Sequence, residues 1–197
     1  MSSQIMDPAP GSIAIGSLAQ ANRHKRRFDA VITLEDPNAR QNLRLRFSRK
    51  PAPAHLVLTF EDVDVTNLGI RVATVEQVRE AIEFARVNAD GSLLVHCFHG
   101  VGRSAAIALA IIADRLGPGA EREALDHLLM VRPEATPNLV VVELADQILH
   151  RSGRLASTVA VWEATVPRLA VARAARLQLA QARPDLYARL DIGRFVQ

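Results

Sequence analysis

The segment Leu93-Leu94-Val95-His96-Cys97-Phe98-His99-Gly100-Val101-Gly102-Arg103-Ser104 is an apolar run that leads into a glycine-containing loop and then into the apolar residues 105–108. This pattern predicts a buried strand, a tight loop and a helix. The five residues between Cys97 and Arg103 allow the backbone to curve until its N–H groups point at one centre, with the start of a helix behind them. Such an arc is suited to binding an anion, phosphate in particular.

The side chains of this segment suit nucleophilic chemistry at a bound phosphate. Among N–H donors and near a helix N-terminus, the pKa of the Cys97 thiol should fall, which predicts a thiolate nucleophile at neutral pH. The planar guanidinium of Arg103 can bind two phosphate oxygens. Ser104 can donate a hydrogen bond to the sulfur, and His96 is expected to orient the loop rather than act as a base. The loop residues expected to bind the substrate are Phe98, His99, Gly100, Val101 and Gly102.

The order His96-Cys97, five residues, then Arg103-Ser104 resembles the signature of the cysteine-dependent phosphatases of the protein-tyrosine-phosphatase superfamily. The later segment Pro137-Asn138, Val141 and Glu143-Leu144 is similar to one in dual-specificity phosphatases, although that family usually has Phe and Gln at positions 141 and 143. The resemblance covers residues 11–152. It implies a phosphatase-like fold and hydrolysis of phosphomonoesters through a phosphocysteine intermediate, with no metal or other cofactor.

The resemblance also implies an aspartate that acts as the general acid from a loop upstream of the cysteine. Asp62 and Asp64 are the two candidates. The local run Phe60-Glu61-Asp62 resembles the aspartate loop of phosphatases related to the tensin group, which favours Asp62 and leaves Asp64 as the alternative. One carboxylate could first donate a proton to the leaving group and then position the water that attacks phosphocysteine. Each of these side chains could instead be a solvated loop carboxylate or a helix cap.

Strand-like and helix-like segments alternate along the chain. Apolar runs predict strands over residues 12–16, 28–34, 55–60 and 93–97, and helical patterns cover 75–89, 105–115, 120–131 and 139–149. Residues 43–47 alternate Leu or Phe with Arg, which fits either a half-exposed strand or an irregular connection. The order predicts an α/β fold with a central, mostly parallel sheet flanked by helices, and with the site at the carboxyl ends of the strands.

The composition changes after residue 152. Arginine, alanine and leucine dominate residues 153–197, which predicts a basic helical C-terminal extension following a phosphatase domain over residues 1–152. Pro167 and Pro184 should divide the extension into pieces. The extension could pack on the domain, pair in a dimer or contact an acidic partner. Its expected apolar side consists of Val161, Trp162, Leu169, Ala172, Leu177 and Leu179.

The composition restricts the compartment and the partners. A single cysteine rules out an internal disulfide and suits a reducing, cytoplasmic compartment. No apolar run approaches the length of a membrane span, and residues 1–10 lack the pattern of a secretory signal. The net charge of +3 gives no reason to expect nucleic-acid binding. The expected partner is a phosphorylated protein or a small phosphate ester, and the sequence leaves the oligomeric state open.

Two other classes of function compete with hydrolysis. The first is a module that binds phosphorylated ligands without turnover. The second is sulfur transfer by a rhodanese-like cysteine loop, which predicts neither the residues around Asp62 nor the Pro137-Asn138 segment.

Overall fold

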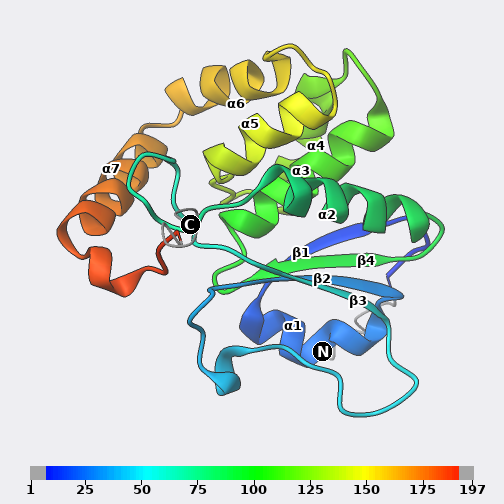
Figure 1. Ribbon diagram of the computed structural model, residues 1–197. Helices are drawn as coiled ribbons and strands as arrows, with labels where there is room; N and C mark the ends of the chain where they lie inside the picture. Colours follow the sequence, from blue (N-terminus) through cyan, green and yellow to red (C-terminus); the bar gives the residue numbers. More distant parts are fainter. Residues whose placement is uncertain (1–7, 191–197) are drawn as a thin grey trace, which may run out of the picture.

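The computed structural model describes residues 8–190 and places a four-stranded sheet at the centre of the molecule (Figure 1). The strands are β1 (Ile13–Ser17), β2 (Ala30–Glu35), β3 (Ala54–Thr59) and β4 (Leu93–Cys97). Their order across the sheet is β1-β4-β2-β3, and every pairing is parallel. The α/β class and the central parallel sheet predicted from the sequence are confirmed.

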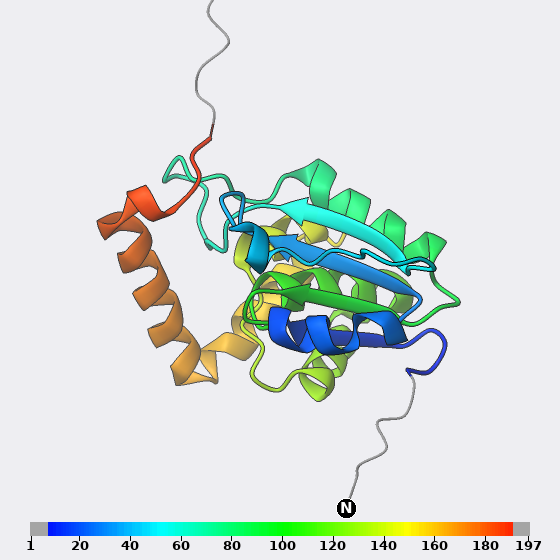
Figure 2. The ribbon, with the colours of Figure 1, turned by 90° about the horizontal axis from the view of Figure 1, so that it is seen from below.

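Helices cover both faces of the sheet. α1 (Leu18–His24) and the long connection between β2 and β3 lie on one face, while α2, α3, α4 and α5 lie on the other (Figures 1 and 2). The remaining elements are α2 (Val75–Val87), α3 (Arg103–Leu116), α4 (Glu121–Val131), α5 (Leu139–Ile148), α6 (Arg154–Ala164), α7 (Pro167–Ala182) and the short 3-10 turns η1 (Lys25–Arg27), η2 (Gln41–Leu43) and η3 (Pro184–Leu186).

The alternation of side chains along the strands divides the core in two. Val31 and Leu94 pack toward α1 together with Ala21 and Leu45. The neighbouring positions on the strands face the other way and join the large core formed with α2 to α6; Cys97 is one of them. α3 lies at the centre of this core, where every residue from Arg103 to Ala113 is buried. The position of Cys97 is therefore set by the register of β4 and by the helix that follows it.

Local sequence explains where the helices next to the site begin. Thr74 and Gln77 form the capping box expected at the start of α2. The Asn138 side chain accepts the Val141 N–H and caps α5. α3 begins at Arg103, two residues earlier than the apolar run from Ala105 indicated, because the backbone turns helical directly at the end of the loop.

Residues 44–47 form an irregular connection and not a half-exposed strand, the two structures that the sequence allowed there. Of the residues expected on the apolar side of the C-terminal extension, only Trp162 and Leu169 are buried. The exposed members are Val161, Ala172, Leu177 and Leu179.

The two C-terminal helices are placed differently. α6 lies on α4 and α5, and its Leu155, Val159 and Trp162 belong to the large core. α7 lies farther out, at the left in Figure 1, beside the connection between β3 and α2. Pro167 begins α7 and Pro184 follows its end, as the sequence indicated. Within residues 8–190, no helix combines the length and the apolar character needed to cross a membrane.

Candidate active site

Cys97 is the last residue of β4, and its sulfur lies at the base of the loop that leads into α3. The residue is 2% exposed. The Gly100 N–H donates a hydrogen bond to the sulfur at 3.2 Å, and the Ser104 hydroxyl lies at the same distance. Both contacts come from groups that can donate a hydrogen bond to the sulfur.

The loop carbonyls are held by donors elsewhere in the fold. The Phe98 carbonyl accepts the Leu18 N–H at 3.2 Å, and the Val101 carbonyl accepts the Thr136 N–H at 2.8 Å. The Gly102 carbonyl accepts N–H groups of Ala106 at 3.0 Å and Asn138 at 3.4 Å. In a planar trans peptide the N–H points opposite to the preceding carbonyl, so the N–H groups of residues 99, 102 and 103 point away from these donors. This orientation is the one that an anion-binding loop needs.

Two glycines allow the loop to lie where it does. Gly100 has φ +79°, and a Cβ there would lie 2.5 Å from the backbone of Gly16 at the end of β1. A Cβ on Gly102 would clash with the carboxylate of Asp62. The first glycine seats the loop against the sheet, and the second lets Asp62 approach the loop closely.

Arg103 is buried, and its guanidinium is held on two sides. Nη1 donates to the Phe60 carbonyl at 2.6 Å, and Nη2 forms an ion pair with Asp36 at 2.8 Å. Nε is buried and has no hydrogen-bond partner among the described residues. Burial alone would lower the pKa of Arg103, but the charges of Asp62 and Asp36 outweigh burial and raise it above its ordinary value. The side chain is therefore a fixed cation that keeps unused N–H donors, the Nε–H among them.

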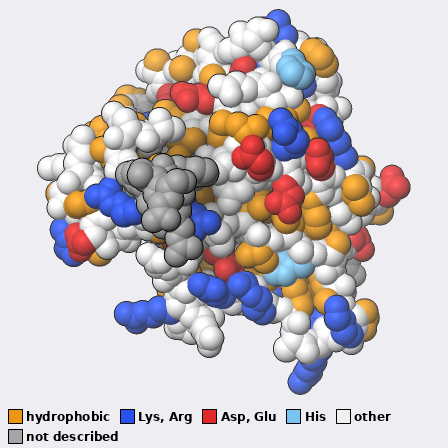
Figure 3. Space-filling model, viewed as in Figure 1, with side chains coloured by type: hydrophobic (Ala, Val, Ile, Leu, Met, Phe, Trp, Pro, Cys, Tyr) orange, Lys and Arg blue, Asp and Glu red, His pale blue; other side chains and the backbone are white. Residues whose placement is uncertain are grey.

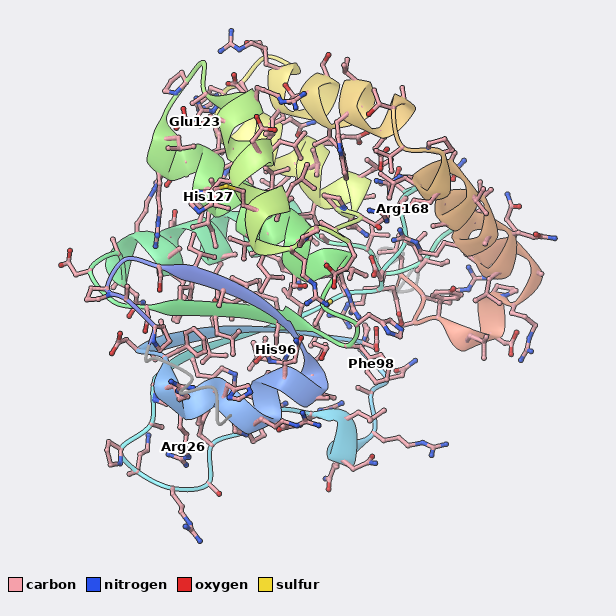
Figure 4. The ribbon with its side chains drawn as sticks, turned by 180° about the vertical axis from the view of Figure 1, so that it is seen from behind. Arg26, His96, Phe98, Glu123, His127 and Arg168 are labelled. Carbon is pink, nitrogen blue, oxygen red and sulfur yellow. The ribbon has the colours of Figure 1, made fainter. Side chains whose placement is uncertain are left out.

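His96 lies on the opposite face of β4 from Cys97. Its Nε2 is 2.8 Å from the Thr33 hydroxyl, and the residue is 1% exposed. Burial lowers the pKa of His96 to about 4, so the imidazole is neutral at pH 7. Figure 4 shows His96 beside the strands and Phe98, two residues further along the chain, beyond the end of β4.

The two aspartate candidates have different surroundings. The Asp62 carboxylate packs against the loop at Gly102 and accepts the Asn138 amide at 3.0 Å. Asp64 accepts the Leu139 N–H at the start of α5, forms an ion pair with Arg173 at 2.8 Å, and is 11% exposed. Asp64 therefore holds elements together, while Asp62 lies against the loop between Cys97 and Arg103.

The outer part of the loop is exposed. Phe98 is 42% exposed, and its ring meets the His99 ring edge to face at a centroid distance of 4.8 Å. A small hollow beside Cys97 is lined in part by Phe98, Leu43 and Asp36. Phe98 and His99 thus form the exposed rim of the loop.

Basic side chains lie on the face of the molecule around the connection between β2 and β3. Figure 3 shows Lys and Arg side chains toward the lower part of the view. Lys25 donates to the Arg46 carbonyl, and Arg26 donates to the carbonyls of Arg49 and Pro51. These two side chains hold the connection in place.

Within residues 8–190, no three His, Cys, Asp or Glu side chains are grouped so that they could hold a metal ion.

The structure adds residues that the sequence did not single out for the site. Asp36 forms the ion pair with Arg103, and Arg176 of α7 lies 3.5 Å from Asp62. Neither residue could be assigned to the site from the sequence, because the residue that each contacts lies far away in the chain. Asn138 lay in the segment that resembles dual-specificity phosphatases, and its contact with Asp62 gives that segment a role at the site.

No protein-family model matches the sequence, and no curated protein sequence matches it. Solved structures do match the fold. Human DUSP28 is 19% identical with a TM-score of 0.51, over 71% of this chain and 92% of that chain. A mouse putative dual specificity phosphatase complexed with zinc tungstate is 21% identical with a TM-score of 0.54, over 80% and 96%. PTPMT1 in complex with PI(5)P is 19% identical with a TM-score of 0.51, over 72% and 95%. The phosphatase-like fold expected from the sequence is thus confirmed.

Proposed function

We propose that this chain, which has the fold of the tyrosine and dual-specificity phosphatases, hydrolyses phosphomonoesters through a phosphocysteine intermediate and without a metal. The observation that carries the proposal is the surroundings of the Cys97 sulfur. The Gly100 N–H and the Ser104 hydroxyl contact it, at the base of a loop flanked by the buried Arg103 cation and the Asp62 carboxylate. These groups supply a nucleophile, an anion site and a proton donor together.

The first step is transfer of the phosphoryl group to sulfur. The Cys97 thiolate attacks phosphorus, an S–P bond forms, and the ester P–O bond breaks. Protonated Asp62 gives its proton to the departing oxygen, so that an alcohol or phenol leaves. The loop N–H groups and the free Nε of Arg103 bind the phosphoryl oxygens, whose negative charge persists through the transition state.

The second step restores the enzyme. Ionised Asp62 accepts a proton from water as the water oxygen attacks the phosphorus of phosphocysteine. The S–P bond breaks and inorganic phosphate leaves. The Ser104 hydroxyl, 3.2 Å from the sulfur, stabilises the departing thiolate by donating a hydrogen bond. His96 takes no proton in either step, because it is neutral and faces away on β4.

The proposed substrates are phosphotyrosine or phosphoserine/threonine on a protein, or a small phosphate ester. The exposed ring of Phe98 at the rim offers an apolar contact to an aryl group. One of the similar structures contains PI(5)P, which makes a phosphoinositide a useful comparison substrate in the same assay. A reducing, cytoplasmic compartment suits a mechanism that depends on the free thiol of Cys97.

The test is hydrolysis of an aryl phosphate in the presence of EDTA by the wild type and three variants. Cys97→Ser should have no measurable turnover, because the sulfur forms the intermediate. Asp62→Ala should lower kcat by about 10²- to 10⁴-fold. Asp64→Ala is the matched control, and its kcat should fall less than that of Asp62→Ala because Asp64 holds α5 and α7 rather than the loop.

Three results would contradict the proposal. Turnover that survives Cys97→Ser would remove the covalent intermediate, and turnover abolished by EDTA would remove the metal-independent mechanism. Tight binding of phosphotyrosine peptides by wild-type protein with no turnover would support the alternative of a module that only binds phosphorylated ligands.

A further inference from the structure

The C-terminal segment, residues 167–190, contacts the aspartate loop, residues 60–73, along most of its length. In Figure 1 the two segments lie side by side at the left of the molecule, and the hydrogen bonds between them agree with that view. The aspartate loop joins β3 to α2 and carries both carboxylate candidates. The surroundings of these carboxylates therefore include a helix outside the segments that resemble phosphatases.

Two arginines of α7 hold the carboxylates by ion pairs. Arg173 pairs with Asp64 at 2.8 Å and with Glu163 of α6, and it donates to the Pro137 carbonyl at 2.9 Å. Arg176 lies 3.5 Å from Asp62 and 3.4 Å from Asp64. Arg173 is 14% exposed and Arg176 is 26% exposed, so both pairs are partly shielded from solvent.

The charge balance shows what these arginines do. Two guanidinium groups face three carboxylates, those of Asp62, Asp64 and Glu163. The carboxylates balance the two positive charges, so the cluster has no excess positive charge with which it could bind a second phosphate group of a substrate. Their effect falls on the carboxylates, whose positions they restrict.

Backbone contacts hold the same loop further along. The Arg71 N–H donates to the Ala188 carbonyl at 2.8 Å, and the Leu190 N–H donates to the Gly69 carbonyl at 3.0 Å. The buried Glu61 carboxylate accepts the Ala188 N–H at 2.8 Å. The residue next to Asp62 is thus attached directly to the C-terminal segment.

A small apolar cluster lies between the ion pairs and the backbone contacts. Val63 and Ile70 of the aspartate loop pack on Ala180 of α7, and Tyr187 covers the cluster. All three of the inner residues are buried. The same segment of the chain therefore holds the aspartate loop near both of its ends.

We propose that Arg173 and Arg176 are positioning residues, through which α7 holds Asp62 against the phosphate-binding loop for proton transfer to the leaving group. The proposal rests on the proposed function and assigns the C-terminal extension a role in it. Proton transfer depends steeply on the distance between donor and acceptor, so a carboxylate free to move away from Gly102 would protonate the leaving oxygen less often.

The test compares two substrates that differ in their need for a proton. Phenyl phosphate releases a weakly acidic phenol and needs the general acid, whereas dinitrophenyl phosphate releases a stable phenolate and does not. Arg173→Gln and Arg176→Gln should lower kcat/KM for phenyl phosphate by about 10- to 100-fold and change it less than about threefold for dinitrophenyl phosphate. Arg168→Gln is the matched control on α7, where the side chain donates to the Pro133 carbonyl rather than to the aspartate loop (Figure 4).

Hydrogen exchange gives a second measurement that does not depend on activity. Backbone amides of residues 61–72 should exchange faster in both variants than in Arg168→Gln, with the rates of β4 and α3 unchanged. Equal losses on both substrates, no loss on either, or unchanged exchange in the aspartate loop would overturn the inference while leaving the hydrolase proposal standing. Wild-type protein that hydrolyses neither substrate would overturn both.

Discussion

At the scale of single residues, His96 and Cys97 show how adjacent positions on a strand acquire different environments. The register of β4 turns the sulfur toward α3 and the imidazole toward α1 and the connection between β2 and β3. There the imidazole meets the Thr33 hydroxyl, which also contacts His55. Because this site excludes water, a charged imidazolium would be costly, and the residue is neutral in the fold.

The lowered pKa of His96 predicts a loss of stability in acid. Its value falls from 6.5 to about 4, so between those pH values the unfolded chain binds a proton that the folded chain does not. The free energy of unfolding should therefore decrease by about 2 kcal/mol at this residue when the pH falls from 7 to 5. Urea unfolding of His96→Asn should show a shallower decrease over this range.

The exposed His127 of α4 provides the matched control (Figure 4). His127→Asn makes the same change of residue type at an exposed position, and so controls for the substitution itself. An equally steep decrease in His96→Asn and in the wild type would mean that His96 is not the group responsible.

At the scale of elements, the junction of α5 and α6 depends on one buried carboxylate. α6 has Gly153 at its N-cap, with φ +82° and no side chain to cap the helix. Asp146 of α5 supplies the cap instead. Its oxygens accept the N–H groups of Gly153 at 2.6 Å, Leu155 at 2.7 Å and Ala156 at 3.2 Å. A single side chain thus fixes the angle between two helices and the direction in which the chain continues toward α7.

Asp146→Ala should therefore be unusually destabilising for a helix cap. It leaves several donors at the start of α6 without a partner, and Asp146 is 5% exposed, so water replaces the carboxylate poorly. We expect the free energy of unfolding to fall by about 2 to 4 kcal/mol. Asp126→Ala, which removes an exposed pair with Arg122 on α4, should cost much less than Asp146→Ala in the same denaturation experiment. Equal losses would contradict the capping role.

At the scale of the whole molecule, the core does not stop at residue 152. Leu155, Val159 and Trp162 of α6 share one buried cluster with the strands and α3, and Leu169 of α7 is also part of it. Burial of these side chains couples the C-terminal extension to the sheet, since removing α6 would expose apolar surface on the remainder.

This shared core predicts a single unfolding transition. Trp162 is the only tryptophan of the chain, so its fluorescence reports on α6 alone, while far-ultraviolet circular dichroism reports on all helices and strands. The two transitions should coincide in guanidinium chloride. If Trp162 fluorescence changed at a clearly lower denaturant concentration than the circular dichroism, the extension would unfold as a separate unit. A domain boundary between residues 152 and 153 would require that result.

Much of the fold could be predicted from the sequence because its elements are marked locally. The apolar runs of β2 and β4, the capping box at Thr74 and the glycines after α3 each depend on residues close together in the chain. Which residues on the apolar side of the C-terminal extension are buried could not be predicted, because helical spacing shows which residues share a face and not whether anything covers that face.

The sequence by itself determined the parallel α/β fold and the loop between Cys97 and Arg103, because strand, turn and helix signals and the short spacing of these two residues act over short distances. Only the tertiary structure decided that Asp62 packs on Gly102, that Asp36 pairs with Arg103 and that α7 contacts the aspartate loop. These contacts join residues far apart in the chain, and they form only when strand order and helix packing bring those segments together.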